Sequence, residues 1–342
     1  MAGRRESFRI SEYLLFAAVT AAVFCLCVCA GSVNIPLGTT IKVIRSALVG
    51  LPQESGTYSA IILTVRIPRV LCVALTGSAL SIAGAAMQGL LKNPLADGST
   101  LGVSSGASLG AVIAIAFGIS FPGLPFAGTM VMAVLFAFGS LLLILGLAYR
   151  LDGSLATNTI ILVGVIFSMF VSSVMNVIIT FSSEKIRSIT FWTMGSLQSS
   201  TMTNAAVLFC ALAAGSFILL SLSRELNAFA VGEENAGSIG VDIRKTKLTV
   251  LITVSVIIGV CVSIGGTIAF VGLVTPHMVR LITGPNHKKL LPASMFAGAV
   301  FLMLSDLAAR ILLDPIELPI GVVTSIVGSV VFVVIFYNSR RR

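Results

Sequence analysis

The chain has 342 residues, of which 56% are hydrophobic and 10% are charged, and its mean hydropathy is +1.06. These values lie far outside the range of soluble proteins and indicate a polytopic membrane protein. A formal net charge of +9 would suggest nucleic-acid binding in a soluble protein. Here the Lys and Arg residues punctuate apolar runs and are better interpreted as topology signals, so no nucleic-acid partner is expected.

Apolar runs of spanning length recur along nearly the whole chain and leave no room for a separate soluble domain. We therefore expect an all-α integral membrane protein in which residues 1–342 form a single transmembrane domain. The first run leads into further spans, so a retained helix is expected there and not a signal peptide. The predicted spans, about ten in number, are 14–33, 60–82, 101–118, 126–148, 156–180, 204–222, 248–266, 268–283, 293–312 and 318–337.

The apolar run 248–283 is too long for one spanning helix and must be divided into two. An unbroken helix over 248–283 would be about 54 Å long, against a hydrocarbon core of ~30 Å. The pair Gly265-Gly266 is the natural place to end the first helix. The second helix is then short, which would suit a helix partly surrounded by its neighbours.

The basic residues divide unequally between the two sides of the predicted bundle. An even number of spans puts both termini on one side, and the positive-inside rule makes the more basic side cytoplasmic. We therefore predict a multi-pass protein of the cytoplasmic membrane with both termini in the cytoplasm. The more basic side carries Arg4, Arg5, Arg9, Lys92, Arg150, Arg224, Arg244, Lys245, Lys247, Arg280, Lys288, Lys289, Arg340, Arg341 and Arg342, and the other side carries Lys42, Arg45, Arg66, Arg69, Lys185, Arg187 and Arg310.

Residues 223–247 form a charged island between two apolar runs, on the predicted cytoplasmic side. Glycines break the island into short turns, and apolar residues such as Val231 and Ile239 alternate with charged ones. Short, partly apolar helices at the membrane surface would suit docking into a groove of another protein. On these residues alone, a solvated connecting loop is an equal alternative.

Small residues recur every four positions in two of the predicted spans. In lipid, such faces let helices approach closely and supply the packing that hydrophobicity does not. We therefore expect these spans to lie in a tightly packed bundle. The two series are Gly77, Ser81, Ala85, Gly89 and Gly102, Gly106, Gly110, Ala114, Gly118.

Candidate catalytic and metal-binding residues are scarce. The stretch GASLG at 106–110 matches the G-x-S-x-G serine-nucleophile pattern, but Ser108 lies within a predicted span and not at a strand-to-helix turn. The six cysteines fall inside apolar runs without forming a ligand cluster, and no H-E-x-x-H or C-x-x-C occurs. We expect no catalytic residue, no metal site and no cofactor.

The energy source follows from two further observations. The sequence has no Gly-Lys pair and so lacks the phosphate-binding loop of ATPases, which means that ATP energy would have to come from a partner. An ion-coupled secondary transporter is the alternative, and it would need titratable groups near mid-membrane. Asp306 is the acidic residue clearly within a span, and Arg310 follows on the same helix face, so this pair is expected to neutralise itself.

Three long blocks of the sequence resemble the FecCD-type permeases, the membrane subunits of ATP-driven importers for ferric siderophores, haem and vitamin B12. The resemblance covers about residues 13–340 and weakens in loops and over 181–202. It implies a type II ABC importer permease fold, a second permease subunit as homo- or heterodimer partner, a separate ABC ATP-binding subunit and an extracytoplasmic substrate-binding protein. The blocks read RIPRVLCVALTGSALSIAGAAMQGLLKNPLADGSTLGVSSGASLG, GTIAFVGLVTPHMVRLITGPNHKKLLP and SDLAARILLDPIELPIGVVTSIVGSVVF.

The resemblance also implies roles for individual residues. The island 223–247 matches the coupling segment that such permeases insert into their ATPase subunits, centred on Ala230, Val231, Gly232, Glu233, Glu234, Ala236, Gly237 and Gly240. The cytoplasmic gate of the family matches Asn93, Leu95, Thr157 and Asn158. On the outer face, Arg66, Arg69 and Arg310 match arginines that meet glutamates of the substrate-binding protein, with snorkelling or an Arg310–Asp306 pair as the structural alternative.

The expected function is therefore that of a permease subunit, without enzymatic activity of its own, in an ABC importer that moves an iron chelate across the cytoplasmic membrane. A ferric siderophore is the first choice of cargo because that class is most frequent in the family. Vitamin B12 and haem are the alternatives, since no side-chain signature selects among them and a broad apolar path is expected.

Overall fold

The computed structural model describes residues 7–31, 33, 35–49, 56–98, 101–120, 127–153 and 156–340. Arg4, Arg5, Arg341 and Arg342, which entered the topology prediction, lie outside these ranges. The described parts of the chain contain helices and no strand. The elements are α1 (Ile10–Cys29), α2 (Leu37–Val49), α3 (Thr57–Ala60), η1 (Ile61–Arg66), α4 (Ile67–Leu90), α5 (Val103–Phe117), α6 (Ala127–Leu151), α7 (Thr157–Phe181), η2 (Ser183–Lys185), α8 (Ile186–Thr193), α9 (Met202–Ser221), α10 (Ser223–Val231), α11 (Glu233–Ser238), α12 (Ile243–Gly265), α13 (Val271–Thr283), α14 (His287–Ile311) and α15 (Ile320–Arg340).

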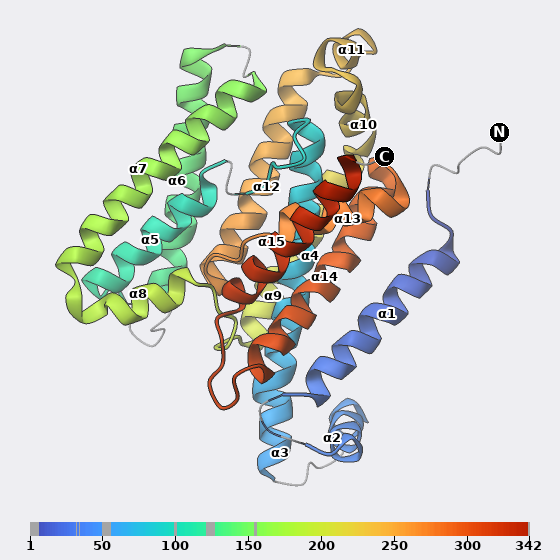
Figure 1. Cartoon of the computed structure of the whole chain (residues 1–342), viewed down its shortest axis with the longest axis vertical. Coiled ribbons are helices and arrows are strands. Elements are labelled where there is room, and N and C mark those ends of the chain that lie inside the picture. The colour runs from blue at the N-terminus through green and yellow to red at the C-terminus, as the bar shows by residue number, and fades with distance from the viewer. Residues whose placement is uncertain are drawn as a thin grey trace.

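Each of the ten predicted spans coincides with a helix, so the all-α membrane fold is confirmed. Within the described residues, seven helices are long and apolar enough to cross a membrane, and α5 and α15 contain shorter apolar helices. The short helices α2 and α8 were not predicted, because they are too short to register as spans, whereas α10 and α11 agree with the short helices considered for the island 223–247. Figure 1 shows α10 and α11 at one end of the bundle and α2 and α3 at the opposite end.

The predicted break at Gly265-Gly266 is confirmed. Helix α12 ends at Gly265, and Gly266 has φ of +67°, a left-handed conformation that glycine adopts without steric cost. A side chain at Gly266 would also overlap the carbonyl oxygen of Trp192. The chain therefore turns here before α13 begins at Val271, and the second helix is short, as expected.

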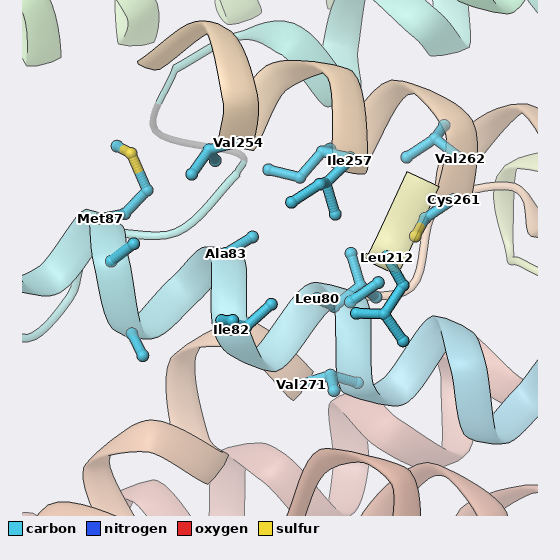
Figure 2. Close-up of a cluster of buried hydrophobic side chains, with 14 of the residues drawn as sticks. Leu80, Ile82, Ala83, Met87, Leu212, Val254, Ile257, Cys261, Val262 and Val271 are labelled. Atoms are coloured by element: carbon cyan, nitrogen blue, oxygen red, sulfur yellow. The ribbon is translucent and has the colours of Figure 1, made fainter. Parts of the chain in front are cut away.

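Helix α4 forms the centre of the bundle and packs against α9, α12, α13 and α14. Its glycines allow this, because a methyl group at Gly77 would overlap the carbonyl oxygen of Gly298 on α14, and one at Gly84 would overlap that of Gly272 on α13. The tight packing predicted from the first small-residue series is thus confirmed. Figure 2 shows the adjoining apolar layer, in which Leu80, Ile82, Ala83 and Met87 of α4 lie beside Leu212, Val254, Ile257, Cys261, Val262 and Val271 of α9, α12 and α13.

The second small-residue series joins α5 to α6. A side chain at Gly106 would overlap Ser140, and one at Gly110 would overlap the carbonyl oxygen of Met132. Helices α5, α6 and α7 pack on one another, and α12 connects this group to α4. On their outer faces, large apolar side chains such as Phe138 and Phe170 are exposed, as expected for surfaces in contact with lipid.

Candidate functional site

The charged island 223–247 folds into α10, α11 and the beginning of α12 and does not form an irregular loop. Leu226 and Phe229 are fully buried and anchor α10 to the bundle, whereas Val231 and Ile239 are each 72% exposed. The buried side chains hold the segment against the bundle, and the two exposed apolar side chains form a surface suited to docking. Gly232, with φ of +140°, provides the backbone conformation that separates α10 from α11.

The predicted coupling residues do not all face outwards. Ala236 is fully buried, which differs from its expected place at the centre of a docking surface. Its small side chain lets α11 lie close to the bundle. Gly232 and Glu233 are half-buried, while the exposed members are Ala230, Val231, Glu234, Gly237 and Gly240.

Two of the predicted gate residues lie beside the island. A cavity of about 550 Å³ is lined by Thr157 and Asn158 at the start of α7 and by residues 232–235. Thr157 Oγ1 donates to Glu233 Oε1 at 3.0 Å, and Lys247 Nζ lies 2.7 Å from Glu233 Oε2. The structure thus brings the first turn of α7 into direct contact with the island.

The other two predicted gate residues lie on the turn that follows α4. The Oδ1 atom of Asn93 accepts a hydrogen bond of 2.9 Å from the backbone nitrogen of Leu95, and the Leu95 side chain is 49% exposed. Leu91 and Lys92, at the start of this turn, line the same 550 Å³ cavity as Thr157, whereas Asn93 and Leu95 are not among its lining residues. The turn after α4 and the start of α7 therefore border one cavity, but of the four predicted gate residues only Thr157 and Asn158 line it.

At the opposite end of the bundle, the three predicted docking arginines lie close together but are buried, with exposed fractions of 5% for Arg66, 6% for Arg69 and 3% for Arg310. This differs from the expectation that they stand on the exposed outer face. Arg69 binds Asp306 at 2.9 Å and Glu317 at 2.7 Å, and Arg310 Nε lies 3.0 Å from Asp306 Oδ2. The Arg310–Asp306 contact is an ion pair without hydrogen-bond alignment, because neither of these two atoms has a hydrogen-bond partner.

Arg66 and Arg310 also donate hydrogen bonds to backbone carbonyl oxygens at the C-terminal end of α1. Arg66 donates to the carbonyl oxygens of Val28 and Cys29 at 3.0 and 2.8 Å, and also to that of Val33. Arg310 donates to the carbonyl oxygens of Cys27 and Ala30 at 3.0 and 3.1 Å. Since the last carbonyls of a helix lack partners within the helix, these guanidinium groups satisfy acceptors that would otherwise be orphaned.

A second cavity, of about 340 Å³, lies between α5, α7 and the segment after α12. Hydroxyl groups from both helices face it together with apolar residues such as Leu80, Ile258 and Phe270, and the apolar part of the lining is the larger. Ser108 Oγ donates to the Ser104 carbonyl oxygen at 2.8 Å, and Ser168 Oγ donates to that of Gly164 at 2.9 Å, so their lone pairs stay available as acceptors. The polar residues lining the cavity are Asp97, Ser104, Ser105, Ser108, Ser168, Ser172, Thr193 and Thr267.

The serine-nucleophile pattern at 106–110 has no elbow geometry. Ser108 is buried inside α5, in continuous helix, and its hydroxyl is bonded to the helix backbone. Within the described residues, no group of three or more His, Cys, Asp or Glu side chains could hold a metal ion, and all six cysteines are free.

Several connections escaped sequence reasoning. Glu317 lies in the turn before α15, where nothing in its neighbourhood indicates a partner on α4. Asn227 Oδ1 on α10 accepts from the backbone nitrogen of His287 at 2.8 Å and so ties the island to the start of α14. For Asn227, the sequence offered only its position inside the charged island, and that position indicated a surface residue and not one with an internal contact.

Comparisons with known proteins place this geometry in a family context. The sequence model of the FecCD transport family matches residues 19–338. The uncharacterized ABC transporter permease YvrB of Bacillus subtilis is 37% identical over 340 residues, which cover 99% of this chain and 96% of YvrB. The cobalamin import system permease BtuC of Halobacterium salinarum is 36% identical over 293 residues, or 86% of this chain and 77% of that protein. A solved metal-chelate type ABC transporter in an inward-facing conformation superposes with a TM-score of 0.83 at 30% identity, covering 96% of this chain and 100% of that one.

Proposed function

The chain belongs to the FecCD transport family of ABC importer permeases, and we propose that it translocates an iron chelate across the cytoplasmic membrane, driven by a separate ATPase subunit. The observation that carries this proposal is the anchored α10–α11 segment, which holds Val231 and Ile239 in solvent. Two large apolar side chains exposed together on one short charged segment suit contact with a partner protein. The ATPase subunit would cover them, and the chain itself would catalyse no reaction.

The cargo assignment is supported by the second cavity, between α5 and α7. Serine side chains of these helices offer hydrogen-bond acceptors and donors to a passing chelate. A ferric siderophore carries hydrogen-bonding groups around the metal and can use these hydroxyl groups, and the similarity to a metal-chelate type transporter supports the same class of cargo. Vitamin B12 is the second candidate, because the relative from Halobacterium salinarum is a cobalamin permease.

The remaining partners follow from the same proposal. We place the α10–α11 end in the cytoplasm with both termini, and the α2–α3 end outside, where an extracytoplasmic substrate-binding protein would dock. A second permease subunit would complete the translocation path. An ion-coupled mechanism is disfavoured by the surroundings of Asp306, since its carboxylate is engaged by Arg69 and Arg310 and is not available to carry a cation.

The docking of the ATPase is tested by replacing Val231 and Ile239 with Asp in the full-length chain. Both variants should fold normally, because these side chains are exposed, and both should lose co-purification of the ATPase subunit of the same importer. Arg224→Gln, an exposed change elsewhere on α10, serves as the matched control. Unchanged co-purification of both Asp variants, or ATP hydrolysis by the isolated chain, would overturn the proposal.

The cargo is tested by uptake into cells that express the complete importer. Ferric hydroxamate, ferric catecholate, haemin and cobalamin are compared as labelled probes at equal concentration. Saturable, ATP-dependent uptake of a ferric siderophore is expected. Uptake restricted to haemin or cobalamin would overturn the siderophore assignment and leave the importer assignment intact.

A further inference from the structure

Glu233 joins three elements through one carboxylate. Its Oε1 atom accepts a hydrogen bond of 3.0 Å from Thr157 on α7, and its Oε2 atom lies 2.7 Å from Nζ of Lys247 on α12. Glu233 is itself the first residue of α11. We call these three residues the Glu233 latch.

The Lys247 end of the latch is fixed. Lys247 is 1% exposed, although lysine is rarely buried without a partner. Breaking a buried ion pair on one side leaves an uncompensated charge, so the Glu233 carboxylate is held towards α12. The side chain of Glu233 is 35% exposed and borders the 550 Å³ cavity.

The Thr157 end of the latch reaches the first residue of α7. Asp152 already caps this helix, because its Oδ2 atom accepts a hydrogen bond of 3.1 Å from the backbone nitrogen of Ala156. A second carboxylate at the same helix start is favoured by the partial positive charge of the helix N-terminus. Among the described residues, α11 packs against α10 and α12 but shares no extensive packing with α7. The Thr157–Glu233 hydrogen bond therefore carries much of the connection between the island and α7.

We propose that Glu233 is the positioning residue that transmits displacement of the α10–α11 segment to the start of α7. Because Lys247 orients the carboxylate, its Oε1 atom stays directed at Thr157, and a movement of α11 together with the start of α12, against which α11 packs, would displace Thr157. The inference rests on the proposed function in one respect: the force on α11 would come from the docked ATPase subunit. The physical contact itself does not depend on that assignment.

The contact is tested first on the chain alone in lipid nanodiscs. Spin labels are attached to cysteines introduced at Asn158 on α7 and Ser238 on α11, both exposed, in a background without the native cysteines. Thr157→Val removes the hydroxyl at nearly constant size, and Thr157→Ser restores it. The matched control is Thr159→Val, which affects the same helix turn but removes a contact with Asp152 and not with Glu233.

Thr157→Val should broaden the distance distribution between the two labels, with a detached population about tenfold larger than in the wild type, as expected for losing one hydrogen bond to a charged group. Thr157→Ser and Thr159→Val should give wild-type distributions. If Thr157→Val gives the wild-type distribution, or if Thr159→Val broadens it equally, the latch is overturned. The measurement uses the chain alone, so its outcome does not depend on whether the chain binds an ATPase.

The transmission role is tested in the complete importer with ferric hydroxamate as probe. Thr157→Val should retain ATPase binding and ATP hydrolysis but consume several-fold more ATP per chelate imported, with rescue by Thr157→Ser. A purely structural contact would lower the amount of folded protein without changing this ratio, and that outcome would overturn the proposal. Loss of ATPase binding in the wild type would instead overturn the proposed function.

Discussion

Arg69 and Asp306, which lie 237 positions apart in the sequence, are joined by two hydrogen bonds of 3.0 and 2.9 Å from Nε and Nη2 to the same carboxylate oxygen. The side chains are 7% and 1% exposed. Their pairing fixes α4 to α14 at the α2–α3 end of the bundle. Because the pair is buried, its loss on one side would leave a charge without compensation.

Arg69→Ala should lower the free energy of unfolding by about 3–5 kcal/mol, the cost of removing one partner of a buried ion pair. Asp306 would keep Arg310 as a neighbour, while Glu317 would lose the salt bridge that it makes with Arg69. Thermal unfolding in detergent, followed by the accessibility of the buried Cys72 and Cys261, would measure the loss. Arg45→Ala on the exposed face of α2 is the matched control and should change little.

The close approach of α4 and α14 gives a second prediction. Gly77→Ala should destabilise the chain by about 1–3 kcal/mol, because the added methyl group would overlap the carbonyl oxygen of Gly298 and force the helices apart. Gly146→Ala on α6 should be neutral or stabilising, since a side chain there meets nothing within 4 Å and alanine favours the helix. Equal unfolding temperatures for the two variants would contradict this account of the α4–α14 packing.

The orientation of the bundle can be measured by cysteine labelling. In a background without the native cysteines, Glu184→Cys on η2 should react with an impermeant reagent added outside intact cells, whereas Glu234→Cys on α11 should react only after the membrane is opened. Both positions are exposed in the structure, so burial does not protect either of them. Labelling of position 234 from outside would reverse the topology and with it the place of the ATPase.

The sequence predicted the spanning helices well because each one needs a long apolar run, and such runs leave a signal that is independent of tertiary contacts. The break at Gly265-Gly266 was predictable for a similar local reason. Short helices such as α8 carry no comparable signal. Their existence depends on packing against the spans.

Apart from the Asp306–Arg310 pair, which follows from a four-residue spacing on one helix, site residues were predictable only where the family resemblance supplied them, and their surroundings were not. The family resemblance suggested an exposed place for Arg310, and its spacing from Asp306 predicted the ion pair that the structure shows. Sequence alone cannot show that the carbonyl oxygens of Cys27 and Ala30 come within its reach. The contact between Thr157 and Glu233 likewise depends on how α7 and α11 meet. Both contacts join polar groups that lie far apart in the sequence, and no local pattern around either group indicates its partner.

Arg66 was predicted, with Arg69 and Arg310, to dock the substrate-binding protein, and the structure suggests an experiment that distinguishes this role from a structural one. Its donors bind three carbonyl oxygens, those of Val28, Cys29 and Val33, around the end of α1. Arg66→Ala should therefore reduce the amount of folded chain and increase proteolysis of α1, because these acceptors lose their partner. Limited proteolysis in detergent would measure that effect.

The matching measurement is the affinity of the substrate-binding protein for the folded fraction of the same Arg66→Ala variant. A structural role leaves this affinity within about threefold of the wild type, whereas loss of one charged contact with a partner carboxylate would weaken it by roughly ten- to a hundredfold. We expect the smaller change, because a partner's glutamate would first have to displace internal hydrogen bonds of a side chain that is only 5% exposed. A hundredfold loss of affinity with normal folding would show that Arg66 leaves α1 on docking, and recovery by Arg66→Glu facing a Glu→Arg change in the binding protein would identify the contact.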